Sequence, residues 1–166
     1  MESWSFPPRY DDAYTPPPDK PYWFPERETM DPAERDELIL GRLREVCAYA
    51  LERSPFYRAK WGDFRPEDLN SLEDFERLPV IRKDELRADQ AAHPPFGTYT
   101  CIEPGDVVRV HGTSGTTGRP TAFGIGRDDW RAIANAHARI MWSMGIRPSD
   151  TVFIGSCTNG RIEDLR

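Results

Sequence analysis

The chain of 166 residues has few cysteines, no excess of positive charge and no long apolar run. Its three cysteines, Cys47, Cys101 and Cys157, form no Cys-x-x-Cys pair, which argues against a disulfide framework or a structural zinc site. A net charge of -6 argues against nucleic-acid binding. Neither a secretory signal nor a stretch approaching the roughly 18 apolar residues of a membrane span is present. The composition therefore favours a cytoplasmic protein with reduced thiols that binds neither nucleic acid nor membrane.

The histidines do not suggest a metal site. His93 is solitary in a proline-rich loop, and His137 lies within a segment that is predicted to be helical. Neither belongs to a cluster of His, Cys, Asp or Glu at metal-ligand spacing. We therefore predict no residues that hold a metal directly.

Three segments of the chain differ in composition. Residues 1–28 combine prolines with aromatic side chains, and this predicts an extended arm because proline lacks an N–H and fixes φ. Residues 29–104 show helical periodicity and predict an amino-terminal helical subdomain. Residues 105–166 form the third segment, which carries strand signals and a glycine-rich loop. We expect Tyr22–Phe24 of the arm to pack on their own domain or on a sister subunit; a proline-rich ligand for a partner domain is the alternative.

Helix signals are clearest in the second segment. Asp31 is an expected N-cap with Pro32 at the first helical position, and apolar residues follow at helical spacing. We expect "SPFY", Ser54–Tyr57, to end this helix. Ser71 predicts the cap of a second, short helix, and another short helix is expected to begin near Lys83.

Strand signals begin after residue 105. "VVRVH" and "TAFGIG" predict two strands joined by a loop, and the following amphipathic segment predicts a helix capped by Arg127 or Asp128. "TVFIG", which begins at Thr151, predicts a further strand of a larger sheet. Because a parallel strand normally needs both faces covered, we expect the chain on its own to be marginally stable, to expose apolar surface and to turn over little or no substrate.

The loop between the two predicted strands carries the strongest chemical signal. Gly112, Gly115 and Gly118 lack a Cβ, so the backbone can adopt φ > 0 and its amides can converge on an anion. Hydroxyl donors stand between these glycines: Thr113, Ser114, Thr116 and Thr117. Arg119 adds a planar cation suited to phosphate. The ligand implied is a polyphosphate, most simply that of ATP.

Two familiar nucleotide-binding motifs are absent. No Gly-x-x-x-x-Gly-Lys occurs, and the loop leads into a predicted strand rather than a helix. The loop does not match Gly-x-Gly-x-x-Gly either. On composition alone, a flexible surface hairpin without a ligand stays open as the alternative.

The loop and its flanks resemble a known family. "TSGTTGRPT", Thr113 to Thr121, is similar to the phosphate-binding signature of the adenylate-forming enzymes, the acyl-CoA synthetase superfamily. "YWFPERETMDPAERDELILGRLREVCAYALERSPFYRAKW" and "SLEDFERLPVIRKDELR" resemble the amino-terminal part of phenylacetate–CoA ligases and their aryl-CoA ligase relatives, over roughly residues 21–154. The resemblance implies an α/β fold with an incomplete sheet, the amino-terminal part of the large domain of such an enzyme. In that domain, residues 105–166 would be the truncated start of the ATP-binding core.

The resemblance also implies site residues. Thr113, Ser114, Gly115, Thr116, Thr117 and Gly118 would hold the β- and γ-phosphates of ATP. Arg119 stands where the family usually has lysine, and Gly112 where relatives often have alanine. Lys83 matches a lysine of a small subdomain that can face the active site; a solvated lysine at a helix start is the alternative.

The implied reaction has two steps. An aryl, phenylacetate-like carboxylate and ATP give an acyl-adenylate and pyrophosphate, and coenzyme A then displaces AMP to give a thioester, with Mg²⁺ on the phosphate oxygens. A homodimer is also implied. The sequence after Gly155 departs from the family, and the lysine of the family's mobile lid has no counterpart in the chain. A non-catalytic nucleotide- or partner-binding remnant and an enzyme that loads a carrier protein therefore stay open as alternatives.

Overall fold

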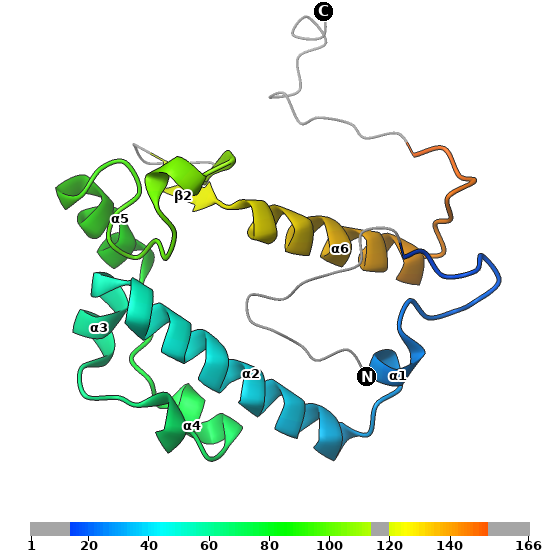
Figure 1. Cartoon of the computed structure of the whole chain (residues 1–166), viewed down its shortest axis with the longest axis horizontal. Coiled ribbons are helices and arrows are strands. Elements are labelled where there is room, and N and C mark those ends of the chain that lie inside the picture. Colours follow the sequence, from blue (N-terminus) through cyan, green and yellow to red (C-terminus); the bar gives the residue numbers. More distant parts are fainter. Residues whose placement is uncertain (1–13, 114–119, 153–166) are drawn as a thin grey trace, which may run out of the picture.

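The computed structural model describes residues 14–113 and 120–152 as a mostly helical chain with one small sheet (Figure 1). The helices are α1 (Pro25–Glu28), α2 (Pro32–Arg53), α3 (Pro55–Trp61), α4 (Leu72–Glu76), α5 (Lys83–Ala92) and α6 (Arg127–Ser143), with 3₁₀ turns at Pro66–Asp68 and Pro104–Asp106. Strands β1 (Arg109–Gly112) and β2 (Ala122–Ile125) pair antiparallel. In Figure 1, α3 and α4 lie beside α2, and the hairpin lies between α5 and the start of α6. No described helix has both the length and the apolar character to cross a membrane.

Helix α2 begins as the sequence predicts. The carboxylate of Asp31 accepts a hydrogen bond from the backbone N–H of Ala33 at 2.9 Å, and Pro32 occupies the first helical position. Near the other end, the Arg44 guanidinium donates to the carbonyl of Leu69, at 2.8 Å from Nε. This bond ties α2 to the 3₁₀ turn that follows α3.

The segment that ends α2 also begins α3, which the sequence analysis did not predict. The Ser54 hydroxyl accepts from the N–H of Tyr57 at 3.3 Å and caps the new helix. Pro55 stands at its first position, where a missing N–H leaves no helical bond unmade. The same Ser-Pro pair therefore stops one helix and starts another.

Helix α4 confirms its predicted cap. Ser71 accepts from the N–H of Asp74 at 3.2 Å, and the Asp74 carboxylate accepts from the N–H of Ser71 at 2.9 Å. The carboxylate also accepts from the N–H of Asn70. These bonds, with that from Asn70 the largest cause, hold the pKa of Asp74 below its usual value.

Helix α5 begins at Lys83, as the sequence predicts. The Glu85 carboxylate accepts from the N–H of Arg82 at 2.7 Å and forms an ion pair with Lys60 of α3. The bond from Lys60, and then that from Arg82, lower the pKa of Glu85. The start of α5 is thereby fixed on α3.

The described part of the arm packs on α6 of its own chain, and Trp23 is its buried aromatic contact. Trp23 is only 8% exposed, and its ring meets that of Trp142 in α6 edge-on, with centroids 5.4 Å apart. The indole N–H of Trp142 donates to the carbonyl of Lys20 at 3.1 Å. Tyr22, by contrast, is 41% exposed. The arm is not wholly extended, because α1 forms a short helix within it.

Two predictions near α6 need correction or stay untested. The N-cap of α6 is Gly126, not Arg127 or Asp128, and its N–H donates to the Asp129 carboxylate at 2.8 Å. Thr151 and Val152 lie in no strand, and the remainder of the predicted "TVFIG" strand lies outside the described residues.

Several apolar side chains are exposed, as the sequence predicts. All four residues of β1 are exposed, and Val110 retains 58% of its accessible surface. Val80 before α5, and Ile140 and Met144 at the end of α6, are also largely exposed. In the described residues, one face of the hairpin is therefore left uncovered.

Candidate nucleotide-binding site

The hairpin closes the base of the glycine-hydroxyl loop with two backbone-directed bonds. In the strand register Gly112 lies opposite Ala122. One residue further on, the N–H of Thr113 donates to the carbonyl of Thr121 at 3.1 Å, and the N–H of Thr121 donates to the Thr113 hydroxyl oxygen at 3.1 Å. This pair holds together the two ends of the segment that the sequence assigns to phosphate binding.

Of the predicted phosphate-binding residues, Thr113 is the one that the structure describes. Ser114, Gly115, Thr116, Thr117, Gly118 and Arg119 lie outside the described residues. The Thr113 oxygen already accepts a bond from Thr121, and its O–H has no acceptor among the described residues. Thr113 therefore retains a donor for an anion at the entrance of the loop.

Thr121 offers a second hydroxyl at the exit of the loop. It is 1% exposed, and its Oγ1 has no hydrogen-bond partner among the described residues. Buried hydroxyls are almost always paired, by protein groups or by ordered water, so a polar partner of this atom is expected beside the loop. The sequence analysis did not single Thr121 out, and its place as the last residue of "TSGTTGRPT" was the only signal.

Gly112 does not need the conformational freedom of glycine that the sequence analysis gave it. It lies in β1, and it is not among the positive-φ glycines of the described chain, Gly62, Gly97 and Gly145. A Cβ built on Gly112 would lie 3.7 Å from the Cβ of Pro120, an ordinary contact. Alanine therefore fits at this position.

Two side chains from outside the hairpin bind the first residue of β2. The N–H of Ala122 donates to Gln90 Oε1 at 3.1 Å, and Gln90 Nε2 donates to the Ala122 carbonyl at 3.2 Å. The same carbonyl accepts from the Tyr99 hydroxyl at 2.7 Å. Burial, and then the nearby Asp89 carboxylate, raise the pKa of Tyr99, so the phenol stays a donor.

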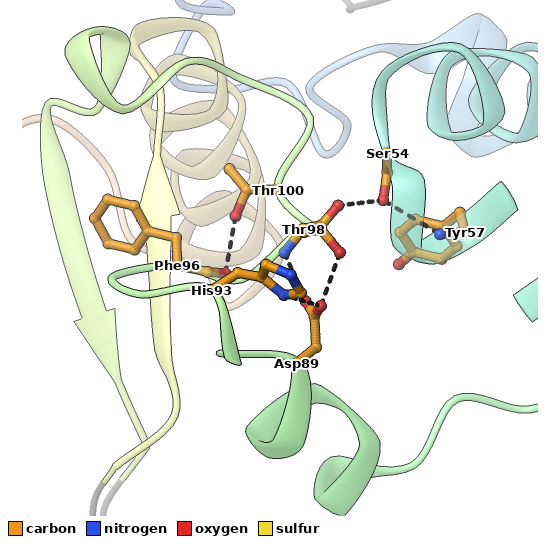
Figure 2. A network of polar contacts seen from close by, with 7 residues as sticks. All are labelled: Ser54, Tyr57, Asp89, His93, Phe96, Thr98 and Thr100. Atoms are coloured by element: carbon orange, nitrogen blue, oxygen red, sulfur yellow. Dashed lines mark hydrogen bonds and ion pairs between the residues drawn. The ribbon is translucent and has the colours of Figure 1, made fainter. Parts of the chain in front are cut away.

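A polar network fixes the loop that carries Tyr99 (Figure 2). The Asp89 carboxylate accepts from the N–H and the hydroxyl of Thr98, at 2.6 and 2.7 Å, and it pairs with His93 at 3.2 Å. The carbonyl of Thr98 accepts from the Ser54 hydroxyl at 2.7 Å. A Cβ on Gly97, where φ is +76°, would lie 2.5 Å from an Asp89 oxygen, so glycine is required there. His93 thus contributes to this network through its contact with Asp89.

Arg87 lines a cavity beside the exit of the loop. A cavity of about 530 Å³ separates α5 from the hairpin, and its walls are Arg87, Gln90, Ala91, Pro94, Pro95, Pro120 and Ala122. Lys83, the first residue of α5, is exposed and does not line this cavity. Arg87 lies one helical turn after Lys83 and lines the cavity. The predicted role of Lys83 stays a prediction.

The described cysteines and acidic residues form no catalytic or metal cluster. Cys47 and Cys101 are free and line a largely apolar cavity of about 600 Å³ beside α2 and α3. Burial raises the pKa of both thiols, which keeps them protonated and unreactive. Across residues 14–113 and 120–152, no group of three His, Cys, Asp or Glu side chains is arranged to hold a metal ion.

The chain resembles solved structures of one CoA ligase. The 2-hydroxyisobutyryl-CoA ligase in complex with 2-HIB-AMP and CoA, in the thioesterification state, matches 90% of this chain with 67% identity and a TM-score of 0.84. An open conformation of the same ligase, also with 2-HIB-AMP and CoA, matches with 63% identity and a TM-score of 0.83. The chain spans 32% of each of these structures. The class to which its homologues belong is that of the adenylate-forming CoA ligases.

Sequence relatives give the family. Phenylacetate-coenzyme A ligases from Thermus thermophilus, Pseudomonas putida and Escherichia coli are 37%, 33% and 33% identical over 75%, 78% and 76% of this chain. The chain spans 27%, 30% and 28% of their lengths. No protein-family model matches the chain. The chain thus aligns with one segment of the phenylacetate-coenzyme A ligases, which confirms the resemblance in its sequence.

Proposed function

We propose that this chain supplies the ATP-phosphate-binding hairpin of an AMP-forming acyl-CoA ligase. The match of 90% of the chain, at 67% identity, to a ligase whose structure holds 2-HIB-AMP and CoA carries the proposal. The geometry supports it, because the Thr113–Thr121 pair joins the two ends of a segment that contains glycines, hydroxyls and one arginine. Such a loop is suited to an anion rather than to an apolar ligand.

In the proposed reaction the loop holds the leaving group. A substrate carboxylate attacks the α-phosphorus of ATP, the bond to the β-phosphate oxygen breaks, and pyrophosphate leaves. The amides of residues 114–119, the Thr113 hydroxyl and the Arg119 guanidinium would receive the charge that develops on pyrophosphate. Mg²⁺ would offset negative charge on the phosphate oxygens. The CoA thiolate then displaces AMP from the acyl-adenylate.

The proposed substrate is a short, branched 2-hydroxy carboxylate rather than the aryl acid that the sequence analysis favoured. Identity to the 2-hydroxyisobutyryl-CoA ligase is 67%, whereas identity to the phenylacetate ligases is 33 to 37%. The presence of CoA in the ligase complex also favours CoA over a carrier protein as acceptor. A cytoplasmic location, a homodimer and a Lys83 that faces the active site stay within this proposal.

Two chimeric ligases test the proposal. Residues 14–152 would replace the matching segment of the 2-hydroxyisobutyryl-CoA ligase in one, and of the Thermus thermophilus phenylacetate ligase in the other. We expect ATP–pyrophosphate exchange near the parent level in the first chimera and a large loss in the second. Arg119→Ala in the first chimera should lower exchange about tenfold or more, because a charge-assisted contact to the leaving group is lost. Equal activity of Arg119→Ala, or the reverse order of the chimeras, would contradict the proposal.

A further inference from the structure

We infer that Gln90 and Tyr99 are positioning residues for the phosphate-binding loop, acting through the backbone of Ala122. This inference rests on the proposed function. Both residues come from the helical part of the chain, Gln90 from α5 and Tyr99 from the loop that follows it. Their partner, Ala122, is the first residue of β2 and follows Pro120 and Thr121 directly.

The Gln90 side chain binds the edge of β2 in the way that the backbone of a neighbouring strand would. The N–H and the carbonyl of Ala122 both bind the Gln90 amide, at 3.1 and 3.2 Å. Thr121, the neighbour of Ala122, directs its own N–H and carbonyl to Thr113 on the opposite side. The end of the loop is therefore bonded from both sides, by β1 and by a side chain that imitates a backbone partner.

The orientation of the Gln90 amide is fixed by its surroundings. Its Nε2 also donates to the carbonyl of Pro95 at 2.5 Å, so both of its N–H groups have acceptors. A flipped amide would place Nε2 against the N–H of Ala122 and its oxygen against two carbonyls. Every polar group of Gln90 is thus matched, which makes the contact specific as well as stabilising.

Tyr99 makes the second contact and is itself held rigidly. Its ring is buried and lies near the rings of Phe56 and Phe123, with centroids 6.2 and 6.0 Å away. The Asp89–Thr98 bonds described above fix the preceding residue. A series of contacts therefore runs from Ser54, at the α2–α3 junction, through Thr98 and Tyr99 to the carbonyl of Ala122.

These contacts fit a positioning role because an anion site works by preorganised donors. A small shift of a donor away from its acceptor costs much of the interaction, and such sites depend on supporting residues that lock the donors in place. Gln90 and Tyr99 do not bind the phosphate themselves in this arrangement. They fix the position of Ala122, and through it the positions of Thr121 and of Thr113, to which Thr121 is bonded.

The test uses the 166-residue chain and inorganic tripolyphosphate, which probes phosphate recognition without the adenine and acyl parts of the substrate. Two quantities would be measured in each variant: exchange of the Ala122 amide by NMR, and affinity for tripolyphosphate. We expect Gln90→Leu to raise Ala122 exchange and to weaken binding about tenfold, and Tyr99→Phe to do both about threefold. Cys47→Ala, a buried change remote from the hairpin, is the control and should leave affinity unchanged at a matched loss of global stability.

The outcomes separate the inference from the proposed function. If the loss of tripolyphosphate affinity across the variants correlates with the rate of Ala122 exchange, and not with global stability, positioning by Gln90 and Tyr99 is supported. Faster exchange of the Ala122 amide with unchanged affinity for tripolyphosphate would overturn the positioning role alone. An unchanged rate of Ala122 exchange in the variants would do the same. Failure of the unmodified chain to bind tripolyphosphate would overturn the proposed phosphate site itself, and the inference with it.

Discussion

The helical region, residues 32–103, and the region of the hairpin and α6, residues 105–152, are stabilised differently. In the helical region, side chains from one element bind the backbone of another: Arg44 binds the Leu69 carbonyl, and Ser54 binds that of Thr98. In the second region β1 is exposed along its whole length. Gln90 and Tyr99 reach from the first region to the second through hydrogen bonds to Ala122.

The difference indicates a division of roles. A region that ties its own helices together can serve as a scaffold, whereas a hairpin with one uncovered face cannot hold a precise geometry alone. The scaffold fixes the position of the hairpin at Ala122, directly after the loop. Variants that strike one region and spare the other should therefore have separable effects.

The largest effect is expected from the core of the helical region. Leu69 is 1% exposed, and Leu69→Ala should lower the free energy of unfolding by about 2–5 kcal/mol through lost burial and a cavity. Urea unfolding followed by circular dichroism measures this change. Val110→Ala in the exposed strand is the matched control, with an expected loss well below that of Leu69→Ala. Similar losses in the two variants would remove the contrast between the regions.

A smaller effect is expected at the α2–α3 junction. Ser54→Ala removes the cap of α3 and leaves the buried carbonyl of Thr98 without its donor, at a cost of about 1–2 kcal/mol. Because Thr98 precedes Tyr99, the Ala122 amide should also exchange faster. An unchanged Ala122 amide in Ser54→Ala would show that the scaffold does not reach the hairpin by this route.

A moderate pH effect is expected within the helical region. The bonds from Lys60 and Arg82 lower the pKa of Glu85 in the folded chain, so their stabilisation is present above the unfolded pKa of about 4.3. It is lost as the pH falls through the lower, folded pKa. The urea midpoint should therefore fall on acidification, and by less in Lys60→Met. Equal acid sensitivity in both proteins would exclude this pair as a cause.

The smallest effect is expected on the exposed face of the hairpin. Val110→Thr keeps the β-branched shape, and with 58% of Val110 exposed it should change stability by less than about 0.5 kcal/mol while improving solubility. Thermal unfolding and the concentration at which the chain precipitates measure the two effects. A loss above about 1.5 kcal/mol would show that this face is covered by the chain itself.

Local signals predicted much of the fold. Asp31 and Ser71 were recognised as caps because capping bonds span only two or three residues, and both strands of the hairpin follow from β-branched runs around a glycine-rich loop. Helix α3 was missed because Pro55 reads equally well as the end of one helix and as the first residue of the next.

Non-local contacts were beyond the sequence analysis. Gln90 and Tyr99 stand 32 and 23 residues before Ala122, and nothing in their own surroundings marks them as its partners. The Thr121 hydroxyl, which has no partner among the described residues, is likewise recognised only when burial is known. Resemblance supplied the phosphate loop, while the scaffold that supports it required the structure.

The most direct test is amide hydrogen exchange of residues 112–122 in the 166-residue chain, with and without ATP. ATP held by the loop should slow exchange of the amides from Thr113 to Arg119, and Arg119→Ala should diminish this protection. Unchanged exchange in this segment at saturating ATP, in a chain that stays folded, would contradict a phosphate-binding hairpin.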